Sequence, residues 1–262
     1  MKWLTRPIDK RFWALYIDGT NFKIQRRSST EREPSLVVLG LGEDNYRSVL
    51  AIEPGTKDNV DAWRAVFGEL KKRGLDPKFV RIGIMDGLPG LETLFCEEFP
   101  NAVTARCWVH SLRNALAKTP ARLRDPFKLL AHKVMYAQSE NDAREAFMAL
   151  KEGMGNDAER AVHCLAKDLD SLLAHYRFDK RFWRALKTTN AIERVNKEFK
   201  RRTKSMGSLG ESSLSVIVAF VALRLEMGWQ RNQVDSKVFE NLPRVKGKNV
   251  IEKIVDEIGL LN

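Results

Sequence analysis

The sequence predicts an α/β fold: a mixed sheet of five strands with flanking helices, interrupted by an all-helical insertion. Three observations lead to this prediction. Apolar runs of strand length occupy the first 106 residues, roughly 70 residues beyond Val109 show helical periodicity alone, and helical patterns continue after residue 187. Of the 262 residues, 44% are hydrophobic and 30% are charged, a balance that supports a real core and excludes wholesale disorder.

The first strand is expected at residues 12–17, an unbroken apolar run typical of a central strand that is buried on both faces. It is expected to end at Asp18-Gly19, because this dipeptide often forms turns. Two more strands follow at 35–40 and 46–52, and a short polar hairpin connection joins them.

A helix is expected to begin at Asp58 and to end at Gly74. Its inward stripe has helical spacing and consists of Val60, Trp63, Phe67 and Leu70. The remaining elements before the insertion are a strand at 80–85, a short helix at 89–97 and a strand at 102–106. The strand at 80–85 ends at Asp86-Gly87, just as the first strand ends at an Asp-Gly pair.

The insertion is predicted to be almost wholly helical from Leu112 to Arg177, because its apolar residues recur at helical spacing. Beyond it, Thr188-Thr189-Asn190 can cap a helix that carries Ile192, Val195 and Phe199 inward. A break at 206–210 and an apolar helix at 212–227 follow. The predicted organisation is a first core part at 1–111, a helical insertion at 112–186, a second core part at 187–231 and a polar tail at 232–262.

Charge and composition narrow the partner class. The chain carries 45 Lys and Arg against 34 Asp and Glu, a net charge of +11 and a pI of about 9.6. The positive electrostatic field of such a chain favours the binding of polyanions, and nucleic acid is the first candidate for a partner. The longest apolar stretch, at 214–223, is far shorter than the roughly 20 residues that span a bilayer, so no membrane partner is expected. The three cysteines are too few for a disulfide framework, which favours a reducing cytosol.

Asp18 and Asp86 form the sharpest chemical feature, because each follows a predicted buried strand. If these strands lie side by side and parallel, the two carboxylates converge at the edge where such sheets bind ligands. Clustered carboxylates repel each other and suit Mg²⁺ or Mn²⁺. The alternative interpretation is that both Asp-Gly pairs merely form turns.

Glu193 offers a third carboxylate at the start of a cationic helix face that includes Lys197, Lys200 and Lys204. A metal ion could lie there beside a phosphate backbone. The alternative is an ordinary surface pair between Glu193 and Lys197, worth a few tenths of a kcal/mol.

Four segments, in this order, carry a family resemblance. They are Tyr16-Ile17-Asp18-Gly19-Thr20, Met85-Asp86-Gly87 with Gly90-Leu91, Cys107-Trp108-Val109-His110, and Thr188-Thr189-Asn190-Ala191-Ile192-Glu193-Arg194-Val195-Asn196 running into Arg201-Arg202-Thr203. The chain resembles the catalytic region of mutator-type (MuDR-like) transposases of bacterial insertion sequences, which are DDE enzymes with an RNase H-like core. The last segment is the most specific, and the resemblance extends from about residue 6 to residue 231.

The resemblance implies a function and a site. It implies DNA transposition by metal-dependent strand cleavage and strand transfer, with Asp18, Asp86 and Glu193 as catalytic residues that hold two Mg²⁺ (or Mn²⁺) ions. The expected partners are double-stranded DNA, at the element ends and the target, and further copies of the chain, in the bacterial cytoplasm beside the nucleoid. The expected DNA-binding residues are Lys197, Lys200, Arg201, Arg202 and Lys204. The remaining family motif residues are Cys107, His110, Thr189, Asn190, Arg194 and Asn196. The alternatives are a nuclease on the same fold and a non-catalytic DNA-binding remnant of a transposase.

The chain departs from the family pattern in two ways. Met85 and Leu88 stand where a polar residue and a histidine are usual. The family also carries a DNA-binding region before its first catalytic strand, whereas seventeen residues precede Asp18 here, so a truncated form is expected.

Two further groups of residues are open to more than one interpretation. Cys107 and His110 have the spacing of half a zinc site, but no second pair completes it, and packing or hydrogen bonding near the active site is expected. Three aromatic residues suit either base stacking or, as expected here, core packing: Trp108, Phe182 and Trp183.

Overall fold

The computed structural model describes residues 5–25, 30–54, 59–88 and 90–203 of the chain. The fold divides into two compact units. The first comprises Met1–Gly83, Leu88–Thr104 and Asn190–Asn262, and the second comprises Ile84–Gly87 and Ala105–Thr189. Among the described residues, no helix combines the length and the apolar character needed to span a membrane.

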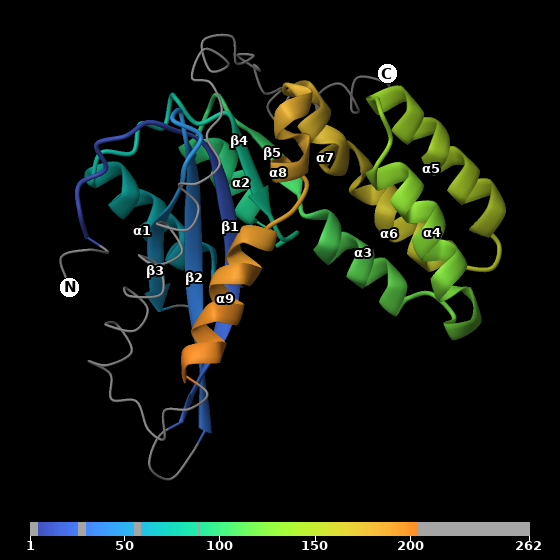
Figure 1. The fold of residues 1–262 in the computed structure, drawn as a ribbon, viewed down its shortest axis with the longest axis horizontal. Coiled ribbons are helices and arrows are strands. Elements are labelled where there is room, and N and C mark those ends of the chain that lie inside the picture. Colours follow the sequence, from blue (N-terminus) through green and yellow to red (C-terminus); the bar gives the residue numbers. More distant parts are fainter. Residues whose placement is uncertain (1–4, 26–29, 55–58, 89, 204–262) are drawn as a thin grey trace, which may run out of the picture. The chain divides into compact units, whose positions relative to one another are not determined.

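The strands form one five-stranded sheet in the order β3-β2-β1-β4-β5, with β1 in the middle (Figure 1). The strands are β1 (Phe12–Gln25), β2 (Thr30–Gly42), β3 (Arg47–Pro54), β4 (Ile82–Met85) and β5 (Val103–Arg106). β2 pairs antiparallel with both β1 and β3. Val103 donates its N–H to Arg81 and Cys107 donates to Met85, so the donor and acceptor positions advance together and β4 and β5 run parallel. The predicted mixed α/β sheet of five strands is confirmed.

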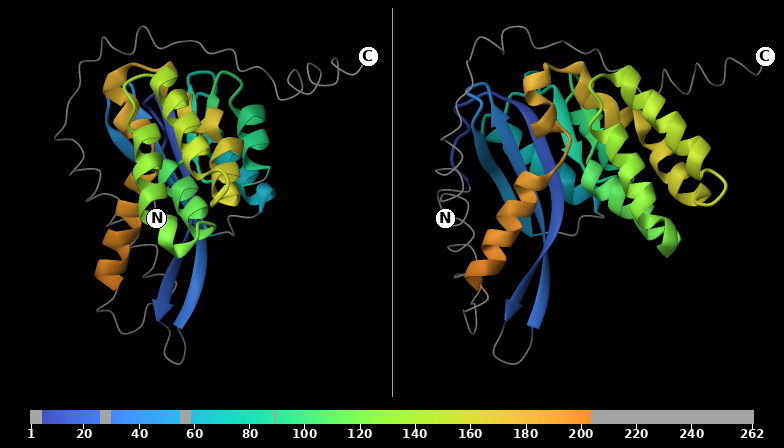
Figure 2. Two further views of the ribbon diagram at one scale, coloured as in Figure 1. Left: turned by 90° about the vertical axis from the view of Figure 1, so that its right-hand side faces the viewer. Right: turned by 45° about the vertical axis from the view of Figure 1, so that its right-hand side comes forward.

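β1 is much longer than the sequence predicts. The expectation that it ends at Asp18-Gly19 is wrong, because the strand continues to Gln25. β2 begins at Thr30 and supplies a partner for every residue of this extension, with Asp18 opposite Val37 and Gln25 opposite Thr30. Continuous pairing therefore overrides the local turn preference of Asp-Gly. Since β3 pairs only with Ser35–Leu41 of β2, the far ends of β1 and β2 form a two-stranded ribbon (Figure 2).

Helix α1 (Val60–Lys72) follows the predicted stripe, with Trp63, Phe67 and Leu70 buried. It begins two residues later than predicted, because the Asn59 side chain caps it by accepting hydrogen bonds from the backbone of Asp61 and Ala62. Its end is as predicted. Gly74 has φ +113°, and the hydrogen bonds from Gly74 to Lys71 and from Leu75 to Leu70 form the glycine-dependent Schellman C-cap.

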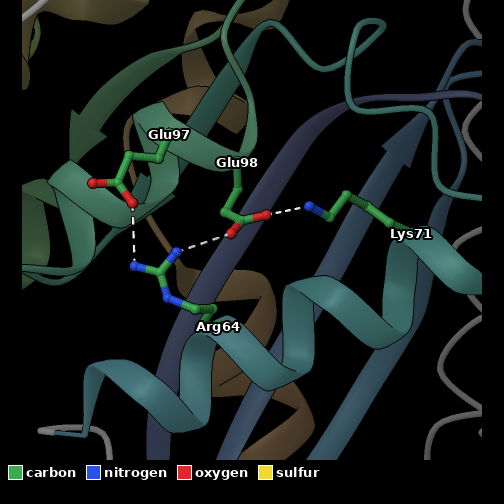
Figure 3. A network of polar contacts seen from close by, with 4 residues as sticks. All are labelled: Arg64, Lys71, Glu97 and Glu98. Carbon is green, nitrogen blue, oxygen red and sulfur yellow. Dashed lines mark hydrogen bonds and ion pairs between the residues drawn. The ribbon is translucent and has the colours of Figure 1, made fainter.

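Helices cover both faces of the sheet within the first unit. Helices α1 and α2 (Leu91–Glu98) lie on one face, and α9 (Asn190–Thr203) lies on the other (Figure 2). The rings of Phe67, Phe95 and Phe99 pack together under α1 and α2, with centroids 4.7–6.0 Å apart. Above them Arg64 bridges Glu97 and Glu98, and Lys71 also pairs with Glu98 (Figure 3). The aromatic cluster provides most of the stabilisation, because ion pairs near solvent contribute about 0–1 kcal/mol.

The second unit is a helical bundle with its own core. Its helices are α3 (Trp108–Ala117), α4 (Arg124–Met135), α5 (Glu140–Met154), α6 (Glu159–Lys167), α7 (Leu169–Leu173) and α8 (Trp183–Leu186), with short 3₁₀ turns η1 (Ala121–Leu123), η2 (Ala174–Arg177) and η3 (Lys180–Phe182). Phe127, Phe147 and Leu165 are among the residues that fill this core. Residues 112–177 are all described and contain no strand, so the predicted helical character of this range is confirmed. The predicted break at 206–210, the helix at 212–227 and the tail lie outside the described residues.

Candidate active site

Asp18 lies inside the apolar middle strand of the sheet. The five residues before it, from Trp13 to Ile17, are fully buried, and Asp18 itself is only 7% exposed. Taking a carboxylate out of water costs several kcal/mol unless hydrogen bonds or a cation compensate. Asp18 does have polar interactions in this setting. The sequence suggested that Asp18 lies in a surface turn. Its burial in a central strand is a much stronger indication of function.

Asp86 follows directly after β4, as predicted, and is half-buried in the second unit. Its Oδ1 accepts the backbone N–H of Gly87 at 2.9 Å, which orients the carboxylate. The guanidinium of Arg106 lies so close to Gly87 that any Cβ there would overlap it. Arg106 also forms an ion pair with Asp168, its Nη2 3.6 Å from Asp168 Oδ1.

No local sequence pattern indicates a role for Arg106. The Asp86-Gly87 pair looks like a turn, whereas the missing side chain of Gly87 also leaves room for the Arg106 guanidinium, which a Cβ at this position would displace. Only the pairing of β4 with β5 brings residues 87 and 106 together, so no local pattern could have indicated this contact.

Glu193 lies in the first turn of α9 and is half-buried. The helix packs against β1 and β2 of the same unit. Ile192 and Val195 are buried as predicted, at 0% and 2% exposed. The sheet-facing stripe of α9 thus orients the helix, and Glu193 follows the buried Ile192 in the chain, about 100° further round the helix.

Cys107 and Thr189 connect two of the motif segments within the second unit. The backbone N–H and the hydroxyl of Thr189 both donate to Cys107 Sγ, at 3.3 Å each. Both residues are essentially buried. Trp108 donates its backbone N–H to the carbonyl of Lys187 at 3.0 Å, which ties the same two segments together once more. The expectation that Cys107 acts through hydrogen bonding agrees with these contacts.

The Cys107 thiol has an unusual environment. Burial alone would raise the pKa of Cys107, but hydrogen bonds from His110 and Thr189 outweigh burial and lower it. Cys107 and His110 therefore interact through a hydrogen bond, which is one of the two roles expected for them. Among the described residues, no three His, Cys, Asp or Glu side chains gather to hold one metal ion.

Lys187 and His175 are two polar residues whose burial the local sequence does not indicate. Lys187 is 8% exposed, and its Nζ donates to the carbonyl of Met135 at 2.7 Å. The ammonium faces the rings of Tyr136 and Tyr176, 5.4 and 6.0 Å from their centroids. Burial lowers the pKa of Lys187. A lysine beside a threonine-rich motif gives no local sign that it is buried.

Three aromatic residues considered for base stacking have other roles. Trp108 is 1% exposed and donates its Nε1–H to the carbonyl of Leu172, and Phe182 is 2% exposed. Trp183 is half-buried, donates to the carbonyl of Phe178 and packs edge-on against Tyr176. Core packing is confirmed for Trp108 and Phe182.

The predicted DNA-binding residues lie on or beyond α9. Lys197 and Arg194 are exposed, and so is Arg201, which forms a two-point ion pair with Glu198 at 2.7 and 3.0 Å. The backbones of Lys200, Arg202 and Asn196 lie in α9, and Asn190 is its exposed first residue. Lys204 lies outside the described residues.

The structure places the predicted catalytic residues in two groups. Asp18 and Glu193 belong to the first unit, on β1 and α9, and Asp86 belongs to the second unit with Cys107, His110 and Thr189. The convergence of the three carboxylates stays a prediction. Their chemistry suits Mg²⁺ or Mn²⁺, because all three offer hard oxygen donors and Asp18 is a buried acid of the kind that a cation stabilises.

Comparison with known proteins gives consistent matches. The model of the family described as "Transposase, Mutator family" matches residues 1–232. The chain is 31% identical over 207 residues to the transposase for insertion sequence element IS6120 of Mycolicibacterium smegmatis, a match that covers 79% of this chain and 62% of the relative. It is 28% identical over 203 residues to the transposase for IS905 of Lactococcus lactis subsp. lactis (strain IL1403), covering 76% and 50%. It is 27% identical over 223 residues to the transposase for IS1201 of Lactobacillus helveticus, covering 83% and 58%. The chain thus spans about half to three fifths of the length of these curated relatives.

Proposed function

Because the chain belongs to the Mutator family of transposases, we propose that it cleaves DNA strands and joins them to new sites during the transposition of an insertion sequence. The observation that carries the proposal is the burial of Asp18 in the middle strand of the sheet, on which α9, the helix that carries Glu193, also packs. The proposal includes a DDE-type site on an RNase H-like core. The element order supports it: three antiparallel strands, a helix, a strand, a helix and a strand.

Asp18, Asp86 and Glu193 would hold two Mg²⁺ or Mn²⁺ ions in this proposal. When bound, such ions make a water or hydroxyl oxygen more nucleophilic and stabilise the negative charge of the phosphodiester as it is attacked. Cleavage adds water across a phosphodiester and leaves a 3′-hydroxyl. In strand transfer, that hydroxyl attacks a phosphodiester of the target and releases another 3′-hydroxyl.

The chain's own residues prepare the site for this chemistry. The apolar strand around Asp18 excludes water, which strengthens the electrostatic interactions of its carboxylate. The N–H of Gly87 holds the Asp86 carboxylate in one orientation. The guanidinium of Arg106, held by Asp168, places positive charge beside Gly87, where a phosphate would be stabilised.

The cations of α9 would bind the DNA backbone, which provides affinity but little sequence readout. Lys197 is exposed and suited to this role, and Arg201 would exchange Glu198 for a phosphate. Lys200, Arg202 and Lys204 complete the proposed set. The partners would be double-stranded DNA at the element ends and the target, together with further copies of the chain, in the bacterial cytoplasm.

The test is strand cleavage by the purified chain on supercoiled plasmid, with Mg²⁺, with Mn²⁺ and with a chelator. We expect nicking that needs the metal and that is lost in Asp86→Asn, while DNA binding stays within about twofold because one neutral isostere leaves the cations in place. Asp61→Asn, at an exposed acid of α1, is the matched control and should cleave like the wild type.

Three other results would contradict the proposal or part of it. Salt-sensitive DNA binding without cleavage in either metal would favour a non-catalytic DNA-binding protein. Cleavage without joining of the 3′-ends would favour a nuclease. Unchanged cleavage by Asp86→Asn would remove Asp86 from the site.

A further inference from the structure

The outward side of α4 combines exposed cations with exposed apolar side chains. Arg124, Lys128 and Lys133 are exposed, as are Leu129 at 63% and Tyr136 at 59%. We call these five residues the α4 outer face. Leu129, Lys133 and Tyr136 recur at i, i+4 and i+7 and therefore share one side of the helix, and Arg124 and Lys128, which are four residues apart, lie on the flank next to it. The opposite side, with Phe127, Ala131 and Val134, is buried in the core of the bundle.

Charge is segregated within the helical unit. Residues 113–133 contain six Lys and Arg and one acid, Asp125, whereas residues 140–159 contain six Asp and Glu and two basic residues. A surface that only needs to be solvated usually mixes the two signs. The one-sided distribution instead produces a positive field over α3 and α4 that attracts polyanions.

The cations of this face are available for a ligand. Within the described part of the chain, Arg124, Lys128 and Lys133 lie within ion-pair distance of no acid. The Arg124 guanidinium only reaches the carbonyl of Thr119, at 3.4 Å. By contrast, Arg144 on the acidic α5 is paired with both Glu140 and Asp170.

Tyr136 is held in place and yet open to solvent. The buried ammonium of Lys187 lies 5.4 Å from its ring centroid, and the ring of His132 packs edge-on at 5.7 Å. These contacts limit the motion of the ring, while more than half of the residue stays exposed. A positioned aromatic ring close to exposed cations is a combination that proteins use to stack an unpaired base beside a bound backbone.

We propose that the α4 outer face is a second DNA-binding surface, in which Arg124, Lys128 and Lys133 bind phosphates and Tyr136 stacks on an unpaired base next to a duplex. The inference rests on the proposed function, since it assumes that DNA is the substrate. It adds to that function a DNA-binding role for helix α4, beside the residues already proposed on α9. An acidic protein could be attracted by the same cations, but it would not need the ring of Tyr136.

The experiment measures the affinity of the full 262-residue chain for two fluorescent DNAs, a blunt duplex and the same duplex with a single-stranded overhang, over a range of salt concentrations. The test variant is Lys128→Gln/Lys133→Gln. Its matched control is Lys151→Gln/Lys167→Gln, which removes the same charge from exposed lysines elsewhere in the helical unit. Since each lost phosphate contact lowers the slope of log K against log salt by about 0.9, we expect a decrease of about 1.8 in the test variant and none in the control.

Tyr136 is tested with the overhang. Tyr136→Leu should weaken binding of the overhang DNA by about 5- to 150-fold, the range for one base–aromatic stack, and should leave blunt-duplex binding unchanged. Tyr136→Phe should bind like the wild type. Far-UV circular dichroism checks that each variant is folded.

The outcomes separate the two proposals. If the wild type binds DNA and the test variant keeps its salt slope, or the control loses as much, this inference is wrong and the proposed function stands. Equal loss of overhang and duplex binding in Tyr136→Leu would overturn the stacking role. If the wild type shows no salt-dependent binding to either DNA, both proposals are wrong.

Discussion

Acid should destabilise the helical unit through one buried histidine. His175 is 1% exposed, and its Nδ1 lies 3.0 Å from the carbonyl of Leu172. A carbonyl only accepts, so Nδ1 carries the proton in the neutral ring, and Nε2 is buried without a hydrogen-bond partner among the described residues. Burial, aided by the nearby charge of Lys187, lowers the pKa of His175 from 6.5 to about 3.

The sign and size of the effect follow from this shift. Below pH 6.5 the unfolded chain binds a proton at His175 that the folded chain does not bind until the pH nears 3, so stability is present at neutral pH and is lost as the pH falls. Each pH unit in this window corresponds to about 1.4 kcal/mol. Between pH 7 and pH 4, His175 alone should therefore reduce the free energy of unfolding by about 3 kcal/mol.

The perturbation that isolates this contribution is His175→Phe. The phenyl ring is similar in size and cannot be protonated, and the carbonyl of Leu172 still accepts the Nε1–H of Trp108 at 2.9 Å. We expect the variant to be close to the wild type at pH 7 and about 3 kcal/mol more stable than the wild type at pH 4. Urea unfolding at both pH values, followed by far-UV circular dichroism, measures this difference.

The comparison between variants removes the contribution of the carboxylates, which titrate in both proteins over the same range. His163→Gln, at an exposed histidine of the same unit, is the control and should follow the wild type at both pH values. An identical pH dependence of wild type and His175→Phe would refute the reasoning, because it would mean that His175 is protonated equally in both states.

Two further changes test the packing around the site. Gly83→Ala should reduce the free energy of unfolding by about 1–3 kcal/mol, because a Cβ there would lie 2.6 Å from Cε1 of the buried Phe95 ring. Gly68→Ala has open space around it in α1 and should instead add about 1 kcal/mol. A melting temperature that falls for both variants would contradict this account. Cys107→Ala should cost about 1–3 kcal/mol, because it leaves the buried N–H and hydroxyl of Thr189 without their acceptor. Adding Thr189→Val should then cost less than it does alone, and strict additivity in urea unfolding would show that the two residues are not coupled.

The local pattern of the sequence was sufficient for most elements. Apolar runs and helical stripes predicted the five strands, α1 and the helical range at 112–177, because their periods of two and 3.6 residues record which side of an element is buried. The C-cap at Gly74 was predictable for a similar reason, since glycine at a helix end has a local conformational cause. The family was also recognisable from four short segments, and the match over residues 1–232 confirms it.

Tertiary contacts decided what the local pattern could not. The Asp-Gly pair at residues 18–19 lies inside β1 because β2 pairs along its whole length, and the one at 86–87 makes room for Arg106 from the neighbouring strand. Likewise, Lys187 and His175 are buried because helices far apart in the chain close over them. The sequence by itself determined the order and type of the elements, since those depend on residues a few positions apart. The tertiary structure alone decided which polar residues are buried and which side chains meet, because these properties depend on contacts between segments that are distant in the chain.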